Sequence, residues 1–214
     1  PNIARSANDD IVVALVGCGG MGRANLRDFI RVPSVKIAAV CDVDDSRLQN
    51  ALSDVEQARK ATGSPLENIH TTKDFRNILE RNDIDSVIVG TPDHWHAYVA
   101  TAACASGKDV YCEKPVSHNI EEGKAMIRAT RNHKRVMQIG TQQRSGTHFQ
   151  SAVDQVRKGA LGKVHVCCTW ITSNVSPNGL GNPDDSSVPA GVDYDMWLGP
   201  APKRPFNKNR FHTK

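Results

Sequence analysis

The sequence has no run of about 18 or more apolar residues, so it contains no segment long enough to cross a membrane as a helix. It also lacks, at its start, the charged segment followed by an apolar one that marks a secretory signal. The opening PNIARSANDD is polar and fits either a mature exported protein or a trimmed cytoplasmic one. The compartment, cytoplasmic or periplasmic, is therefore left open, and no membrane partner is expected.

The cysteines include no CxxC pair of the kind that binds zinc or carries out redox chemistry. Most of them lie in or beside apolar runs typical of strands, where cysteine behaves as a small buried hydrophobe. Disulfide frameworks belong to short chains with weak cores, whereas 214 residues can bury a sizeable core. The cysteines concerned are Cys18, Cys41, Cys104, Cys112, Cys167 and Cys168.

No stripe of basic residues accompanies the formal net charge of +4, because Lys and Arg interleave with Asp and Glu over residues 42–85. We therefore expect no nucleic-acid partner. Hydrophobic residues make up 39% and charged residues 23% of the chain, which excludes the composition of a disordered protein.

Short apolar runs rich in β-branched residues alternate with segments of helical spacing as far as residue 140. Strands are expected at 11–16, 35–42, near 69, 86–90, 109–115 and 135–140. Helices are expected at 23–31, 46–63, 73–81, 96–106 and 119–133, the second capped by Ser46 and ended by Gly63. This alternation predicts right-handed βαβ units, and hence an α/β fold with a doubly wound parallel sheet of the Rossmann type.

The pattern changes after Gly140. Residues 148–159 predict one more amphipathic helix, and KVHVCCTWIT (163–172) predicts a strand that opens a second domain. From residue 173 to 214 the chain is rich in Pro, Gly, Asn and Asp, and predicts a loop of about 40 residues, too long for the end of a compact domain. We therefore predict a dinucleotide-binding domain over 1–144 and the incomplete start of an α/β substrate and oligomerisation domain over 145–214.

The loop GCGGMG follows the first expected strand and opens the first expected helix. Gly17, Gly19 and Gly22 form the pattern G-x-G-x-x-G, in which the glycines allow a tight turn, close approach to a pyrophosphate and close helix packing. The helix N-terminus adds N–H groups and partial positive charge. The candidate pyrophosphate site thus also includes Gly20 and Met21; the alternative is a glycine-rich turn without a ligand.

Asp42 ends the second expected strand, 20 positions after Gly22, where an acid can accept hydrogen bonds from the adenosine ribose hydroxyls. Its charge would repel a 2'-phosphate, and no arginine follows until Arg47, so the sequence favours NAD over NADP. The alternative role, capping the next helix, suits Asp44 or Asp45 better than Asp42.

The segment GTPDHWHAYVA follows the fourth expected strand, at the sheet edge where open α/β sheets bind ligands. Thr91, Pro92 and His96 are expected to face the cofactor. His94 and His96 have a spacing compatible with a metal, but no Cys or carboxylate cluster completes a ligand set, so no metal is predicted. For His94 we favour a helix-capping role.

Lys114 follows the fifth expected strand, between Glu113 and Pro115. A lysine at this edge can donate to a substrate hydroxyl or carbonyl and stabilise alkoxide charge during hydride transfer. The alternative is an ordinary surface pair between Lys114 and Glu113. Pro115 restricts Lys114 to extended geometry.

Taken together, the segments resemble the Gfo/Idh/MocA family of NAD(P)-dependent oxidoreductases over nearly the whole chain. The resemblance is carried by GCGGMG, VCD, GTPDHWH, GKDVYCEKPVS, QIGTQQR and RKGALGKV. It implies a Rossmann domain followed by an α/β domain whose open sheet supports homo-oligomers and closes the substrate pocket.

The same resemblance implies roles for single residues. Lys114 matches the family's catalytic lysine, whereas Thr91, Pro92, His96 and Glu113 match its nicotinamide-side positions. The candidate cofactor site also includes Lys114 itself and Arg144, which lies where the family often has an arginine. The family's Asp-x-x-x-His motif does not occur downstream of Lys163 and is expected beyond Lys214, so we expect this chain to bind cofactor better than it turns over substrate.

The resemblance implies hydride transfer between NAD and a secondary alcohol of a sugar or cyclitol. One alternative is a glycosidase of the same superfamily that keeps NAD as an internal redox relay; the intact Glu113-Lys114-Pro115 argues against it. A second is a non-catalytic NAD-binding module. The identity of the substrate is not written in this sequence.

Overall fold

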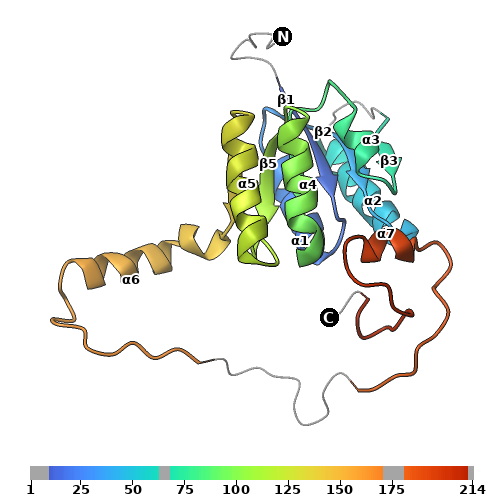
Figure 1. Cartoon of the computed structure of the whole chain (residues 1–214). Helices are drawn as coiled ribbons and strands as arrows, with labels where there is room; N and C mark the ends of the chain where they lie inside the picture. Colours follow the sequence, from blue (N-terminus) through green and yellow to red (C-terminus); the bar gives the residue numbers. More distant parts are fainter. Residues whose placement is uncertain (1–9, 63–67, 171–180, 212–214) are drawn as a thin grey trace. The chain divides into compact units, whose positions relative to one another are not determined.

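The computed structural model describes residues 10–62, 68–170 and 181–211 (Figure 1). Contacts within the chain divide it into two compact units, Pro1–Gly140 with Ser187–Arg204, and Thr141–Ser186 with Pro205–Lys214. The segment Ser187–Arg204, called the returning segment below, therefore packs with the N-terminal unit although it lies far along the chain. The domain limits 1–144 and 145–214 stay a prediction.

The N-terminal unit contains one six-stranded parallel sheet with the order β3-β2-β1-β4-β5-β6. Its strands are β1 (Ile11–Val16), β2 (Val35–Cys41), β3 (His70–Thr72), β4 (Ser86–Val89), β5 (Asp109–Glu113) and β6 (Met137–Gly140). In this order the chain reverses its direction of travel between β1 and β4, and open α/β sheets bind their ligands at the carboxyl ends of the strands at such a point. The predicted parallel sheet of the Rossmann type is confirmed.

Helices cover both faces of this sheet (Figure 1). Those of the N-terminal half are α1 (Gly20–Ile30), α2 (Asp45–Thr62), α3 (Arg76–Leu79), α4 (Asp93–Ala105) and α5 (Ile120–Asn132). Alternate side chains of β1 point to opposite faces, so Leu15 packs with Leu26 of α1, whereas Ala14 belongs to the core beneath α3, α4 and α5. Because both faces are buried, each central strand needs a continuous apolar run.

All five helices begin one to three residues away from the predicted starts, and two of these starts concern the loops at the ligand edge. Helix α2 begins at Asp45, because the Asp44 carboxylate accepts a hydrogen bond from Ser46 N at 2.8 Å. The predicted cap by Ser46 is therefore wrong and the alternative, Asp44, is confirmed; the predicted end at Gly63 lies outside the described residues. Helix α4 begins at Asp93, earlier than expected, directly after Pro92.

The second unit begins with a 3-10 helix, η1 (Gln142–Ser145), and the predicted amphipathic helix, α6 (Thr147–Arg157). The strand predicted over 163–172 is wrong for its described part, since residues 163–170 form no strand. A strand is stabilised by ladder hydrogen bonds, and no described segment pairs with these residues.

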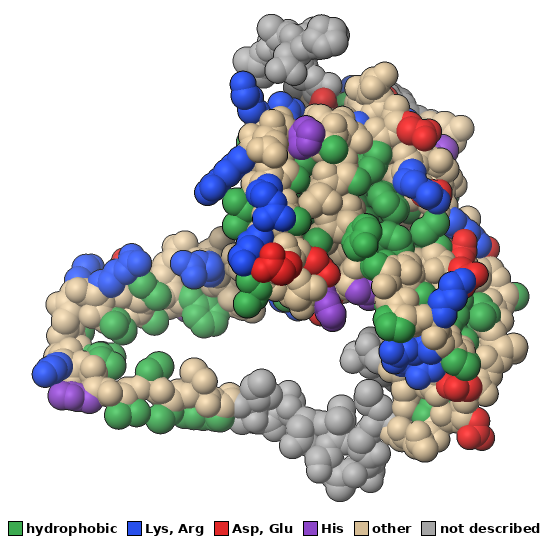
Figure 2. All heavy atoms as spheres, in the orientation of Figure 1, with side chains coloured by type: hydrophobic (Ala, Val, Ile, Leu, Met, Phe, Trp, Pro, Cys, Tyr) green, Lys and Arg blue, Asp and Glu red, His purple; other side chains and the backbone are tan. Residues whose placement is uncertain are grey.

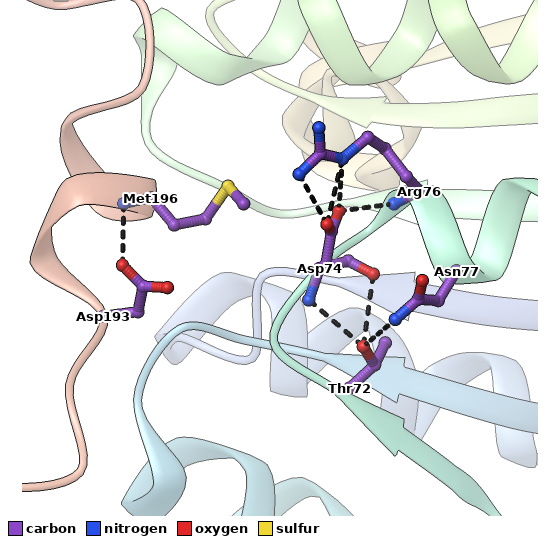
Figure 3. A network of polar contacts seen from close by, with 6 residues as sticks. All are labelled: Thr72, Asp74, Arg76, Asn77, Asp193 and Met196. Atoms are coloured by element: carbon purple, nitrogen blue, oxygen red, sulfur yellow. Dashed lines mark hydrogen bonds and ion pairs between the residues drawn. The ribbon is translucent and has the colours of Figure 1, made fainter.

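The loop predicted over 173–214 contains a short helix, α7 (Tyr194–Leu198), within the returning segment. The Asp193 side chain accepts from Met196 N at 2.9 Å and caps this helix (Figure 3). The prediction of a continuous loop is therefore wrong here, and residues 173–180 lie outside the described part. Among the described residues, no helix combines the length and apolar character needed to cross a membrane.

Candidate functional site

Three glycines meet where β1, α1 and β4 come together. A Cβ added to Gly22 would lie 1.9 Å from Gly17 O, and one added to Gly90 would lie 2.7 Å from Gly22 Cα. Gly17 has a φ of 92°, a conformation that side-chain-bearing residues rarely adopt. Packing alone therefore requires the first and third glycines of the loop, which brings α1 against the end of β4.

The middle of the loop faces open space instead. A Cβ added to Gly20 would meet nothing within 4 Å. The cap residue Gly19 makes no side-chain cap hydrogen bond, and the first turn of α1 has no acidic residue. The first backbone N–H groups of a helix have no partners within it, so this terminus fits a small anion such as a pyrophosphate.

Asp42 directly follows β2 and turns its carboxylate toward the glycine loop. Its Oδ2 accepts from Cys18 N at 2.6 Å, and its Oδ1 accepts from Asp44 N at 3.0 Å. Asp42 thus lies where a ribose-binding acid was predicted. It also fixes the backbone of the loop, a role that the sequence analysis missed.

Cys18, the second residue of the loop, is a buried thiol. Its Sγ donates to Cys41 O at 3.4 Å. Burial, followed by the charge of Asp42, raises the pKa of the Cys18 thiol well above its ordinary value. Cys18 therefore stays protonated at neutral pH and does not serve as a nucleophile.

Arg47 of α2 approaches the same loop. Its Nη1 lies 3.0 Å from the position that a Cβ on Gly19 would take. The absence of an arginine between Asp42 and Arg47 in the sequence favoured NAD. The fold nevertheless brings the Arg47 guanidinium beside the glycine loop. The prediction of NAD rather than NADP therefore depends on the negative charge of Asp42 alone.

Thr91 and His96 lie at the carboxyl end of β4. The Thr91 hydroxyl is buried and has no hydrogen-bond partner among the described residues. The His96 ring is 1% exposed; its Nε2 lies 2.9 Å from Thr91 O and its Nδ1 lies 2.6 Å from Pro115 O. A buried hydroxyl without a partner fits a site completed by a ligand, whereas the contact of His96 with a cofactor stays a prediction.

The first turn of α4 holds the returning segment. The cap residue of α4 is Pro92, and His94 Nε2 lies 2.8 Å from Trp197 O, so the predicted capping role of His94 is wrong. The Trp95 indole N–H donates to the carbonyls of Met196 and Trp197, each at 3.1 Å. Within the described ranges, no group of three or more His, Cys, Asp or Glu side chains could hold a metal.

The other end of the returning segment contacts the loop after β2. Asp193 N donates to Val43 O at 2.9 Å, and Asp45 N donates to Gly191 O at 3.1 Å. The segment therefore joins the loop that carries Asp42 to the first turn of α4. These backbone contacts carry no sequence signal beyond Asp193, a residue type that commonly caps helices.

Glu113 ends β5 and turns inward. It is 3% exposed, its Oε1 accepts from Asn25 Nδ2 at 2.8 Å, and its Oε2 accepts from Lys114 N at 3.2 Å. The alternative of a surface pair with Lys114 is therefore wrong. The Lys114 side chain is exposed, and no described residue pairs with its ammonium group, which lies at the ligand edge of the sheet.

Arg144 belongs to η1 of the second unit and is exposed. Its role in cofactor binding stays a prediction.

A glycine loop that opens a helix, an acid at the end of β2 and a ligand edge at the reversal between β1 and β4 define a Rossmann dinucleotide-binding domain. The profile of the Gfo/Idh/MocA oxidoreductase family, NAD-binding Rossmann fold, matches residues 11–141. The profile of the C-terminal alpha/beta domain of the same family matches residues 155–214. The chain belongs to this family.

Relatives of this chain include oxidoreductases and glycosyl hydrolases. The uncharacterized oxidoreductase YrbE of Bacillus subtilis (strain 168) is 30% identical over 156 residues, 73% of this chain and 42% of that protein. A glycosyl hydrolase family 109 protein of Saccharopolyspora erythraea is 35% identical over 123 residues, 56% of this chain and 26% of that protein. The chain spans less than half the length of these relatives.

Solved structures of similar fold include dehydrogenases. Myo-inositol 2-dehydrogenase from Lactobacillus plantarum has a TM-score of 0.60 at 23% identity, covering 73% of this chain and 43% of that chain. The WlbA dehydrogenase from Bordetella pertussis, in complex with NADH and UDP-GlcNAcA, has a TM-score of 0.60 at 22% identity, covering 74% and 43%. These similarities show the shared α/β fold.

Proposed function

We propose that this chain is the cofactor-binding part of an oxidoreductase that moves hydride between NAD and a secondary alcohol of a sugar or cyclitol. The observation that carries the proposal is the placement of the open α1 terminus, Asp42 and Lys114 along one edge of the sheet. The similar structures of a myo-inositol 2-dehydrogenase and of the WlbA dehydrogenase in complex with NADH and UDP-GlcNAcA support the substrate class. Relatives of this kind also lead us to propose a homo-oligomer.

The α1 terminus would hold the pyrophosphate, with Gly20 leaving the space for it. Asp42 would accept hydrogen bonds from the adenosine ribose hydroxyls and repel a 2'-phosphate, which favours NAD over NADP. Bound NAD supplies the hydride acceptor, and the protein supplies orientation and charge. Thr91 and Pro92 would line the nicotinamide side.

Lys114 would act on the substrate. Its ammonium can donate a hydrogen bond to the oxygen that changes between hydroxyl and carbonyl, and stabilise the negative charge that develops there. The exposure of Lys114 and the inward turn of Glu113 support this role, because the lysine charge is not neutralised by its neighbour.

A second candidate function is glycoside cleavage with NAD as an internal redox relay, which the glycosyl hydrolase family 109 relatives support. The intact Glu113-Lys114-Pro115 favours the dehydrogenase. An assay of NADH absorbance with sugars and inositols separates the two, because the dehydrogenase accumulates NADH and the glycosidase releases a sugar without net cofactor reduction.

Binding of NAD by this chain is tested most cleanly at Gly20, where an added Cβ would meet no atom of the protein within 4 Å. We expect Gly20→Asp to fold and to weaken NAD binding at least about tenfold, since its carboxylate would oppose the pyrophosphate. Gly20→Asn, of the same size but neutral, is the matched control and should bind more tightly than Gly20→Asp. Equal NAD affinity of the two variants and the parent chain would contradict the proposed pyrophosphate site.

A further inference from the structure

Two buried side chains hold the backbone on either side of the peptide that joins Lys114 to Pro115. On one side, Glu113 Oε2 accepts from Lys114 N at 3.2 Å. On the other, His96 Nδ1 lies 2.6 Å from Pro115 O. The exposed Lys114 side chain therefore extends from a backbone that is held at Lys114 N by Glu113 and at Pro115 O by His96.

The Glu113 carboxylate is itself held by two other elements. Asn25 of α1, which is 5% exposed, donates from Nδ2 to Glu113 Oε1 at 2.8 Å. A Cβ added to Gly140, at the end of β6, would lie 2.7 Å from the same oxygen, so the carboxylate packs directly on this glycine. The carboxylate thus connects the helix that follows the glycine loop to the backbone of Lys114.

The His96 ring connects two loops. Its Nε2 lies 2.9 Å from Thr91 O in the loop after β4, while Nδ1 faces Pro115 O in the loop after β5. Carbonyl oxygens only accept, so each contact is a hydrogen bond when the ring nitrogen carries a proton. A glutamine amide also has two N–H donors, whereas leucine has none.

We propose that Asn25, Glu113 and His96 are positioning residues for Lys114. They are 5%, 3% and 1% exposed, and their contacts lead to the backbone of Lys114 and Pro115. A lysine side chain has four flexible bonds, and fixing its backbone limits where its ammonium can reach. This inference rests on the proposed function, in which Lys114 lies beside the nicotinamide half of NAD.

The test compares NAD with ADP, which carries the adenosine and pyrophosphate but no nicotinamide riboside, by calorimetric titration of the whole chain. Lys114→Ala should weaken NAD binding and leave ADP binding unchanged. His96→Leu and Asn25→Ala should show the same pattern, with NAD weakened about fivefold to tenfold, the effect of losing roughly one buried hydrogen bond. His96→Gln should restore NAD binding to within about threefold of the parent chain, because its amide N–H can still donate to a backbone carbonyl.

Ile78→Val is the matched control for general loosening, because Ile78 is a fully buried residue of α3 outside these contacts. It should leave both affinities unchanged. Equal weakening of NAD and ADP by His96→Leu and Asn25→Ala would overturn the inference, since a merely structural role affects the whole site. Failure of His96→Gln to restore NAD binding would overturn the role of the two hydrogen bonds.

Different binding results would contradict the proposed function itself. A parent chain that binds neither NAD nor ADP, or a Lys114→Ala variant that binds NAD as the parent does, contradicts the role of Lys114 itself. If His96→Leu does not fold, Asn25→Ala and His96→Gln give the same comparison. Hydrogen exchange of the peptide over 109–118 adds a readout without cofactor, and it should be faster in Asn25→Ala but unchanged in Ile78→Val.

Discussion

The indole N–H of Trp95 donates to the backbone carbonyl of Trp197 at 3.1 Å, which joins the start of α4 to a helix far along the chain. The Trp197 ring stacks on Tyr194 at 5.6 Å between centroids, and Tyr194 and Leu198 are buried. The returning segment therefore completes the core and the ligand edge of the N-terminal unit.

Trp95→Phe should loosen the returning segment, because it keeps an aromatic ring but removes the only side-chain donor of this residue. We expect a loss of about 1 kcal/mol in the free energy of unfolding, and faster proteolysis within residues 187–204. Trp170→Phe is the control, since Trp170 is 78% exposed. Identical proteolysis of the two variants would contradict the role of the indole hydrogen bond.

A chain that ends at residue 144 should be less stable than the complete one. It would lose the buried Tyr194 and Leu198, and burying one large apolar side chain contributes about 1.5–3 kcal/mol. Urea unfolding followed by circular dichroism should show a lower midpoint for residues 1–144. An unchanged midpoint would mean that the predicted domain 1–144 is stable without the returning segment.

Asp74 stabilises the start of α3 in a manner that depends on pH (Figure 3). Its carboxylate accepts from Arg76 N at 3.0 Å and from the Arg76 guanidinium. The hydrogen bond from the guanidinium is the main reason why the pKa of Asp74 lies below its ordinary value. The folded pKa lies below the unfolded one, so the stabilisation is present above about pH 4 and is lost as the pH falls through the folded pKa.

Asp74→Ala should therefore lower the free energy of unfolding by about 1 kcal/mol at pH 7, and by less at pH 3. Denaturant unfolding of both chains at the two pH values measures this difference. Asp74→Asn keeps an acceptor for Arg76 N without the charge, so its free energy of unfolding at pH 7 should lie between those of the parent chain and Asp74→Ala. A difference between Asp74→Ala and the parent that grows toward acid pH would contradict this account.

The cysteines should separate into two groups toward a thiol reagent. Cys167 and Cys168 are exposed, whereas Cys18, Cys41, Cys104 and Cys112 are buried. Burial raises the pKa of the Cys112 thiol to about 12, so it stays protonated and unreactive at neutral pH. Titration of the folded chain should label Cys167 and Cys168 quickly and the others only after unfolding; rapid labelling of Cys18 would contradict the closed packing of the glycine loop.

Continuous apolar runs made the sheet predictable from sequence. A short, β-branched run such as IVVALV favours a strand buried on both faces, and it became β1 with the predicted bounds. The positions of the glycine loop, Asp42 and Lys114 followed because parallel strands bring their carboxyl ends to one edge. These are local patterns combined with one topological rule.

The contacts between distant segments were not predictable in this way. The inward turn of Glu113 depends on Asn25, and the position of Arg47 beside Gly19 depends on how α2 packs. The contacts of the returning segment with α4 use backbone carbonyls, which carry no sequence signature. The predicted strand over 163–172 was wrong over its described part, 163–170, because strand propensity alone supplies no ladder partner.

The most direct test of the central claim is a calorimetric titration of the chain with NAD and with NADP, repeated on Asp42→Asn. We expect the parent chain to bind NAD at least about tenfold more tightly than NADP, because the Asp42 carboxylate repels the 2'-phosphate. Asp42→Asn should weaken NAD binding and reduce the difference between the affinities for NAD and NADP. Tighter binding of NADP than of NAD would show that Arg47 decides the preference, and no binding of either cofactor would contradict the dinucleotide site itself.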